Sequence, residues 1–307
     1  MQIINSQSKF KNEDTAVVVG KFDCLHLGHM EIIDDILSRP LKSLVFTFSE
    51  SPRIILSHSN EPVKNILTNA EKEKILEGKN IDYLLYYEFS KEFMSLSPED
   101  FIRLLVEKYH MKYISAMDDF RFGSKNSGDT AFLQSMAQKY GYKCHIVPAV
   151  RNEDDEVITS TLIRSRISEG RIKSANDMLG YDYFVSGKIV HGRGMGKKVL
   201  DFPTINLIPD SKKLLPPNGA YVTKIEFPDG KIYGGMTNIG FKPTVSGKNH
   251  LGIETHIFDF DHDVYGRDCR VIFLKYIRPE KKFDSLTSLS EQLSRDKEFS
   301  KQYFIHI

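Results

Sequence analysis

The chain has 307 residues, 40% of them hydrophobic and 27% charged, which is typical of soluble globular proteins and long enough for two domains. Its 42 basic and 41 acidic residues leave a net charge of +1, which argues against a nucleic-acid-binding protein held by bulk positive charge. Three cysteines without a CxxC pair exclude a disulfide scaffold and a cysteine-rich zinc site. Because no signal peptide and no membrane-spanning run is predicted, we expect a cytoplasmic protein that does not bind membranes.

The first half of the chain predicts strands that alternate with helices. The expected strands are short apolar runs at residues 16–20, 41–48, 81–89, 112–117 and 143–150. Helices are expected from about His29, over residues 69–80, after the N-cap residue Ser97 with Pro98 in the first turn, and over residues 128–140. This alternation predicts an α/β domain with a doubly wound parallel sheet and helices on both faces.

The pattern changes near residues 181–185, where short strands and tight turns begin. Runs at residues 221–227, 231–239, 254–261 and 269–276 predict an antiparallel barrel. Three leucines at helical spacing predict a helix at the end of the chain: Leu286, Leu289 and Leu293. We therefore expect two domains, at residues 1–182 and 183–307.

The stretch VVVGKFDCLHLGH, residues 17–29, leaves a predicted buried strand and opens a predicted helix. Such loops hold ligands in α/β sheets, and the N-terminus of a helix favours an anion. Gly20 and Gly28 allow close backbone approach, while His26 and His29 can donate hydrogen bonds to phosphate oxygens. Two other interpretations stay open on the residues alone: histidines satisfied in a core, or a metal held by Asp23, His26 and His29.

GKFDCLHLGH resembles the G-x-F-D-G-x-H-x-G-H signature of nucleotidyltransferases that couple ATP to a phosphorylated small molecule. Further segments resemble the bacterial bifunctional riboflavin kinase/FAD synthetase family and occur in its order: DDFRFGSKNSGD (118–129), STLIRSRI (160–167), DFPTIN (201–206), NIGFKPT (238–244) and ETHIFDFDHDVYG (254–266). The resemblance covers nearly the whole chain. It implies an FMN adenylyltransferase (FAD synthetase) domain followed by a riboflavin kinase domain, a six-stranded barrel with a terminal helix.

In the first domain, the resemblance implies that His26, His29 and Arg164 are catalytic. The other ATP-binding residues that it implies there are Gly20, Phe22, Asp23, Gly28, Ser160 and Thr161. Asp119, Phe120 and Arg121 are the implied flavin-binding residues. The implied reaction is attack of the FMN phosphate on the α-phosphorus of ATP, which gives FAD and releases pyrophosphate, with Mg²⁺ on the phosphates.

In the second domain, the resemblance implies that Glu254 is the general base, which accepts the ribityl hydroxyl proton of riboflavin during γ-phosphoryl transfer from ATP. Thr204 and Asn206 are the implied ligands of Mg²⁺ and ATP, and both are hard oxygen donors. Three residues of a glycine cluster are also implied to bind ATP, and one arginine to bind flavin: Gly192, Gly196, Lys197 and Arg278. We expect small-molecule partners only, and a monomer or weak homo-oligomer.

Four residues depart from the family pattern. Cys24, Met117 and Asp201 stand where the family has glycine, and Ser51 replaces a histidine. A side chain at residue 24 would cost about 1 kcal/mol or more if the backbone there were left-handed. Asp201 adds negative charge near a phosphate-binding segment, so a monofunctional FAD synthetase with a weakened or inactive kinase domain stays open. A non-catalytic flavin-binding regulator and a nucleotidyltransferase for another phosphorylated alcohol are further alternatives.

Overall fold

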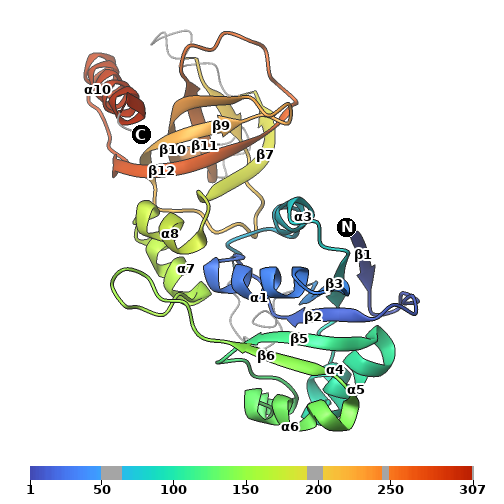
Figure 1. Ribbon diagram of the computed structural model, residues 1–307. Coiled ribbons are helices and arrows are strands. Elements are labelled where there is room, and N and C mark those ends of the chain that lie inside the picture. The colour runs from blue at the N-terminus through green and yellow to red at the C-terminus, as the bar shows by residue number, and fades with distance from the viewer. Residues whose placement is uncertain (50–63, 192–202, 244–248, 306–307) are drawn as a thin grey trace. The chain divides into compact units, whose positions relative to one another are not determined.

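The computed structural model describes residues 1–49, 64–191, 203–243 and 249–305 (Figure 1). The chain forms two compact units, Met1–Ser160 and Thr161–Ile307. These units are defined by packing, and the functional division expected after residue 182 stays a prediction. None of the helices in the described ranges combines the length and apolar character needed to cross a bilayer.

The first unit is built on a parallel sheet, as predicted, with six strands rather than the five expected. Its strands lie in the order β1-β4-β3-β2-β5-β6. Their bounds are β1 Gln2–Asn5, β2 Thr15–Val19, β3 Lys42–Phe48, β4 Tyr83–Tyr87, β5 Met111–Met117 and β6 Lys143–Val147. The edge strand β1 was not expected from the sequence, because it has only four residues and three of them are exposed.

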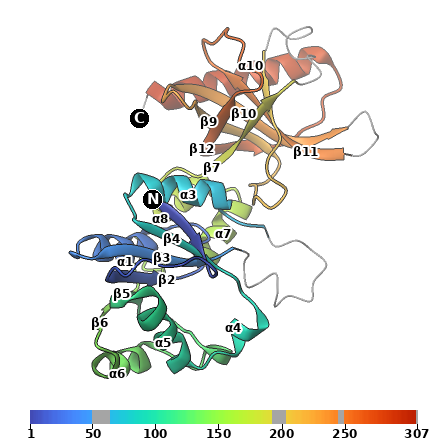
Figure 2. The ribbon, with the colours of Figure 1, turned by 90° about the vertical axis from the view of Figure 1, so that its right-hand side faces the viewer.

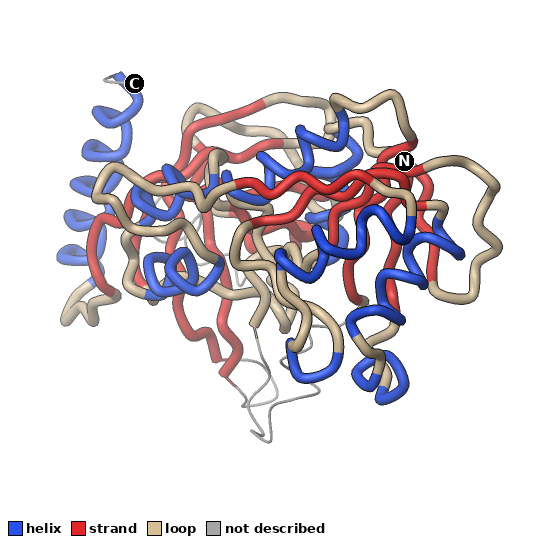
Figure 3. The backbone as a smooth tube through the Cα atoms, turned by 60° about the horizontal axis from the view of Figure 1, so that its bottom comes forward, coloured by secondary structure: helices blue, strands red, loops and turns tan. Residues whose placement is uncertain are grey.

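Helices cover both faces of this sheet (Figures 2 and 3). They are α1 Leu27–Leu37, α3 Asn69–Gly78, α4 Lys91–Ser95, α5 Pro98–Tyr109 and α6 Thr130–Tyr140, with a short 3₁₀ turn η1 at Ser124–Asn126. Helix α5 begins as predicted, since Ser97 accepts from the Asp100 N–H and Pro98 occupies the first turn. Phe101 and Leu105 of α5 pack in one core with Phe46 and Ile114 of the sheet.

The strand order predicts a ligand-binding site at the carboxyl end of β2. The chain passes from β2 through α1 to β3 on one side, and later from β4 through α4 and α5 to β5 on the other side of β2. Connections that diverge in this way leave a crevice where open α/β sheets bind ligands. The loop that leaves β2 at this point carries Gly20 through His26.

The second unit is a closed six-stranded barrel in the order β10-β11-β8-β7-β12-β9, in which all pairings are antiparallel, as predicted. Its strands are β7 Phe184–Val190, β8 Ile205–Leu207, β9 Gly219–Glu226, β10 Ile232–Pro243, β11 Asn249–Ile257 and β12 Asp268–Pro279. Helices α7 Ser160–Ser168 and α8 Ile172–Leu179 precede the barrel, and α10 Leu286–Ile305 follows it.

The terminal helix exists as predicted, but its leucines do not form a buried face. Leu286 is 61% exposed, and the buried residues of α10 are Asp296 and Ser300. Asp296 accepts from Nε and Nη2 of Arg278 on β12, at 3.0 and 2.7 Å. A buried ion pair therefore fastens the helix to the barrel, which leucine spacing does not reveal.

Candidate active sites

The loop after β2 holds an irregular backbone that places its side chains inward. Phe22 and Leu25 have φ of +46° and +47°, and both side chains are fully buried. Cys24 is not among the residues with positive φ, so the strain considered for a side chain at this position does not arise. A Cβ added to Gly28 would lie 3.0 Å from Cε of Met117, so the two departures from the family pattern, Cys24 and Met117, both pack within this site.

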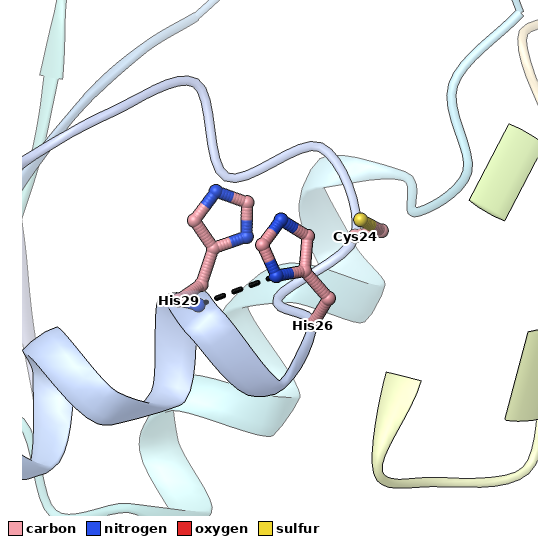
Figure 4. Close-up of side chains that lie close together, drawn as sticks. All are labelled: Cys24, His26 and His29. Carbon is pink, nitrogen blue, oxygen red and sulfur yellow. Dashed lines mark hydrogen bonds between the residues drawn. The ribbon is translucent and has the colours of Figure 1, made fainter. Parts of the chain in front are cut away.

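His26 and His29 lie face to face at the start of α1 (Figure 4). His26 is the N-cap, and its Nδ1 accepts from the His29 backbone N–H at 3.4 Å. The ring centroids are 3.7 Å apart. Because Nδ1 of His26 accepts, a neutral His26 carries its proton on Nε2 and can donate it to an anion.

Both imidazoles are neutral near pH 7. Burial lowers the pKa of His26 to about 4. Burial lowers the pKa of His29 well below its usual value, and repulsion from a protonated His26 and from Lys72 acts in the same direction. The pair therefore offers neutral N–H donors, not positive charges, to a ligand at the start of α1.

Asp23 bonds to the backbone of the segment that precedes α3. Its carboxylate accepts from the Ile66 N–H at 3.2 Å, and its carbonyl accepts from the Leu67 N–H at 2.9 Å. The group of potential metal ligands in this loop is Cys24, His26 and His29, whose ligand atoms lie within 4.8 Å of one another. The metal interpretation based on Asp23 is thus replaced by one based on Cys24.

Lys72 is a site residue that sequence reasoning missed. It lies on α3, is 4% exposed and donates to the Lys21 carbonyl at 3.2 Å. Burial lowers its pKa to about 8, although the charge of Asp23 acts in the opposite direction. The run NAEKEKILEG gives no signal for a buried lysine, because alternating Glu and Lys is typical of a solvated helix face.

The other residues predicted for the first site are only partly brought together. The Ser160 hydroxyl lies 3.3 Å from Sγ of Cys24. Thr161 and Arg164 belong to the second packing unit, so their contact with ATP beside the histidines stays a prediction. Of the flavin-binding candidates, Asp119 and Arg121 are exposed, and Phe120 stacks on Phe122 with centroids 5.2 Å apart.

The barrel brings its three principal candidates together. The Thr204 hydroxyl donates to Oε1 of Glu254 at 2.7 Å. Asn206 of β8 is the cross-strand partner of Glu254 on β11. The sequence did not single out His256, which is buried two residues further on and whose Nδ1 lies 2.9 Å from the Pro203 carbonyl. His256 thereby positions the segment that carries Thr204.

The remaining candidates do not join this group in the described part of the chain. Arg278 is held by Asp296, which gives it a structural role; flavin binding by Arg278 stays a prediction. Five residues named from the sequence lie outside the described residues: Ser51, Gly192, Gly196, Lys197 and Asp201.

Comparisons with known proteins match both halves of the chain. The family model described as FAD synthetase matches residues 8–162, and the one described as riboflavin kinase matches residues 179–304. The fold and these matches define a two-domain transferase in which a nucleotidyltransferase domain precedes a flavokinase domain.

Relatives of known name match nearly the whole chain. A bifunctional riboflavin kinase/FMN adenylyltransferase of Buchnera aphidicola is 35% identical over 95% of this chain and 95% of its own, and that of Bacillus subtilis is 31% identical over 97% and 95%. A crystal structure from Streptococcus pneumoniae, titled a macrolide-efflux protein, is 32% identical, covers 97% of this chain and 98% of its own, and has a TM-score of 0.87. The chain belongs to the bifunctional riboflavin kinase/FMN adenylyltransferase family.

Proposed function

We propose that this chain makes FAD from riboflavin in two ATP-dependent steps, riboflavin phosphorylation in the barrel and adenylation of FMN in the parallel-sheet domain. The observation that carries the proposal is the match of both family models in one chain, together with the Thr204–Glu254 pair that the barrel forms. ATP and flavins are its small-molecule partners. We place the enzyme in the cytoplasm, as a monomer or weak homo-oligomer.

For the adenylyl transfer, the FMN phosphate attacks the α-phosphorus of ATP, the α–β bridging bond breaks, and pyrophosphate leaves. His26 donates its Nε2–H to a phosphate oxygen, and the neutral His29 donates its own N–H beside it. Donors held in place by a helix cap and by ring stacking stabilise the charge that grows on the leaving pyrophosphate without reorganising. A role for Arg164 as a charged partner of the ATP phosphates rests on the family resemblance alone, because Arg164 belongs to the second packing unit.

For the phosphoryl transfer, Glu254 accepts the proton of the ribityl hydroxyl while that oxygen attacks the γ-phosphorus of ATP, and ADP leaves. Thr204 fixes the rotamer of Glu254 by donating to Oε1. The hydroxyl oxygen of Thr204 and the amide oxygen of Asn206 are donors that fit Mg²⁺, and Glu254 beside them is left to act as the base. When bound, Mg²⁺ neutralises phosphate charge.

A paired substrate assay tests the proposal. The purified chain is given MgATP with riboflavin in one reaction and with FMN in another, and products are separated by chromatography. We expect FMN and then FAD from riboflavin, and FAD with pyrophosphate from FMN. FAD from FMN without any product from riboflavin would replace the bifunctional assignment by the monofunctional one. No turnover in either reaction would favour a flavin-binding regulator.

A further inference from the structure

Beside its two imidazoles, the first site contains a buried thiol, Cys24, that phosphate binding does not need. Cys24, His26 and His29 each offer one ligand atom, and these atoms lie within 4.8 Å of one another (Figure 4). The side chain of Cys24 is fully buried. Nδ1 of His29 is also buried and has no hydrogen-bond partner among the residues that the structure describes. A buried ring nitrogen of this kind is rare unless something else binds it.

The chemistry of this set selects the kind of ion. One sulfur and two imidazole nitrogens suit Zn²⁺ and similar transition metal ions, whereas Mg²⁺ prefers oxygen. Three protein ligands with an open fourth position are a common arrangement for zinc. Reorienting the His26 ring toward an ion costs little. The hydrogen bond that it would lose, from the His29 N–H to Nδ1 of His26, is long at 3.4 Å and therefore weak.

We propose that Cys24, His26 and His29 bind one Zn²⁺-like ion, and that the bound ion competes with ATP for the adenylylation site. Competition rests on the proposed function, since the imidazoles that ligate the ion are those proposed to donate to the ATP phosphates. On binding, the thiol of Cys24 loses its proton to solvent, and the hydrated ion exchanges water molecules for one sulfur and two nitrogens. The negative charge of Asp23 attracts the bound cation, and the positive charge of Lys72 on α3 repels it.

Binding of Co²⁺ can be measured by its absorption spectrum, so this test of the metal site does not depend on enzyme activity. The nucleotide-free chain is titrated with Co²⁺, and thiolate-to-cobalt charge-transfer absorption is followed in the near ultraviolet. We expect one Co²⁺ per chain with this band, displaced by one Zn²⁺. Cys24→Ser keeps a polar atom near Ser160 but removes the thiolate, and it should weaken binding at least about 100-fold, since even losing an outer-shell partner costs 10–100-fold. Cys144→Ser, which removes a thiol on β6, is the matched control and should bind as the wild type does.

Activity then tests the competition. With FMN and MgATP, added Zn²⁺ should raise the apparent KM for ATP of the wild type and of Cys144→Ser, and leave that of Cys24→Ser unchanged. Chelation of ATP by zinc is the same in all three reactions. Cys24→Gly provides a second variant if Cys24→Ser does not fold. Absence of the band, a band that survives both Cys24 substitutions, or equal inhibition of all variants would overturn the proposal. If the chain made no FAD at all, the cobalt titration would still decide the metal site separately.

Discussion

Two stacked imidazoles lie at the start of α1, where the His26 side chain caps the His29 N–H and its other nitrogen stays available for the proposed phosphate contact. Removing the His29 ring leaves that cap in place. We therefore expect His29→Ala to lower FAD formation from FMN by about 100-fold or more, as loss of one transition-state donor does. FMN formation from riboflavin in the same variant is the control. Unchanged FAD formation would refute the role of His29.

In the proposed phosphoryl transfer, the Thr204 hydroxyl acts through Glu254, to which it donates. Hydrogen bonds to charged groups contribute about 1.5–3 kcal/mol, so Thr204→Val should slow riboflavin phosphorylation roughly 10- to 100-fold. Thr204→Ser keeps the donor and should restore most of the rate. FAD synthesis from added FMN, measured by chromatography, should not change in either variant. Equal phosphorylation rates for Val, Ser and the wild type would contradict this role.

Single residues were predictable to different degrees. A signature with fixed spacing predicted His26 and His29 as site residues, and an ordered set of motifs predicted Thr204 and Glu254; the structure places each pair side by side, while their roles stay predictions. Lys72 was not predictable, because its burial depends on how α3 packs, and nothing in a run of Glu and Lys indicates which lysine turns inward. The direction of the Cys24 side chain was equally hidden, since it depends on left-handed residues on either side.

At the scale of elements, Asp35 fastens α1 to the neighbouring strands. Tyr113 on β5 donates to Oδ2 at 2.9 Å, and Nδ1 of His145 on β6 lies 3.0 Å from the same atom. Arg39, two residues beyond the end of α1, pairs with the other oxygen. Burial alone would raise the pKa of Asp35, but its hydrogen bonds outweigh burial and lower the pKa to about 2. The carboxylate is therefore favoured in the folded state.

The sign of the pH dependence follows from this shift. The contribution of Asp35 to the free energy of unfolding is fully present above its ordinary pKa of 3.8. It is lost as the pH falls through the folded-state pKa of about 2. Asp35→Asn should lower the free energy of unfolding by about 1–3 kcal/mol at pH 7 in urea denaturation, and should flatten its decrease between pH 4 and 2. The control Asp34→Asn removes an exposed pair with Lys79 and should cost under about 1 kcal/mol. Equal losses for both variants would contradict the anchoring role.

Elements with a strong pattern were predictable, and those held by tertiary contacts were not. The apolar runs of β2 and β3 and the capped start of α5 gave correct elements. Strand β1 pairs only with β4 at the edge of the sheet, and its side chains are mostly exposed, so it lacks a hydrophobic signature. On α10, the Arg278–Asp296 pair outweighs the leucine pattern because its polar groups are buried together.

For the whole molecule, the question is whether the two reactions communicate through free FMN. His29→Ala should convert riboflavin to FMN and stop, and Glu254→Gln should fail on riboflavin but use added FMN. Neither variant alone should make FAD from riboflavin. Because each variant retains the site that the other lacks, mixing them should restore FAD formation after a lag while FMN accumulates in solution. Chromatography over time measures both intermediates and products.

The lag distinguishes two ways for FMN to travel. With FMN released to solution, the lag should shorten as the concentration of His29→Ala rises, and FMN added at the start should abolish it. A control mixture of the wild type with either variant should show no longer lag than the wild type alone. If His29→Ala makes no more than one FMN per chain and the mixture makes no FAD, whereas the wild type does, FMN stays bound and passes between sites of one chain without release. In that case the two domains form one catalytic unit rather than two enzymes on a single chain.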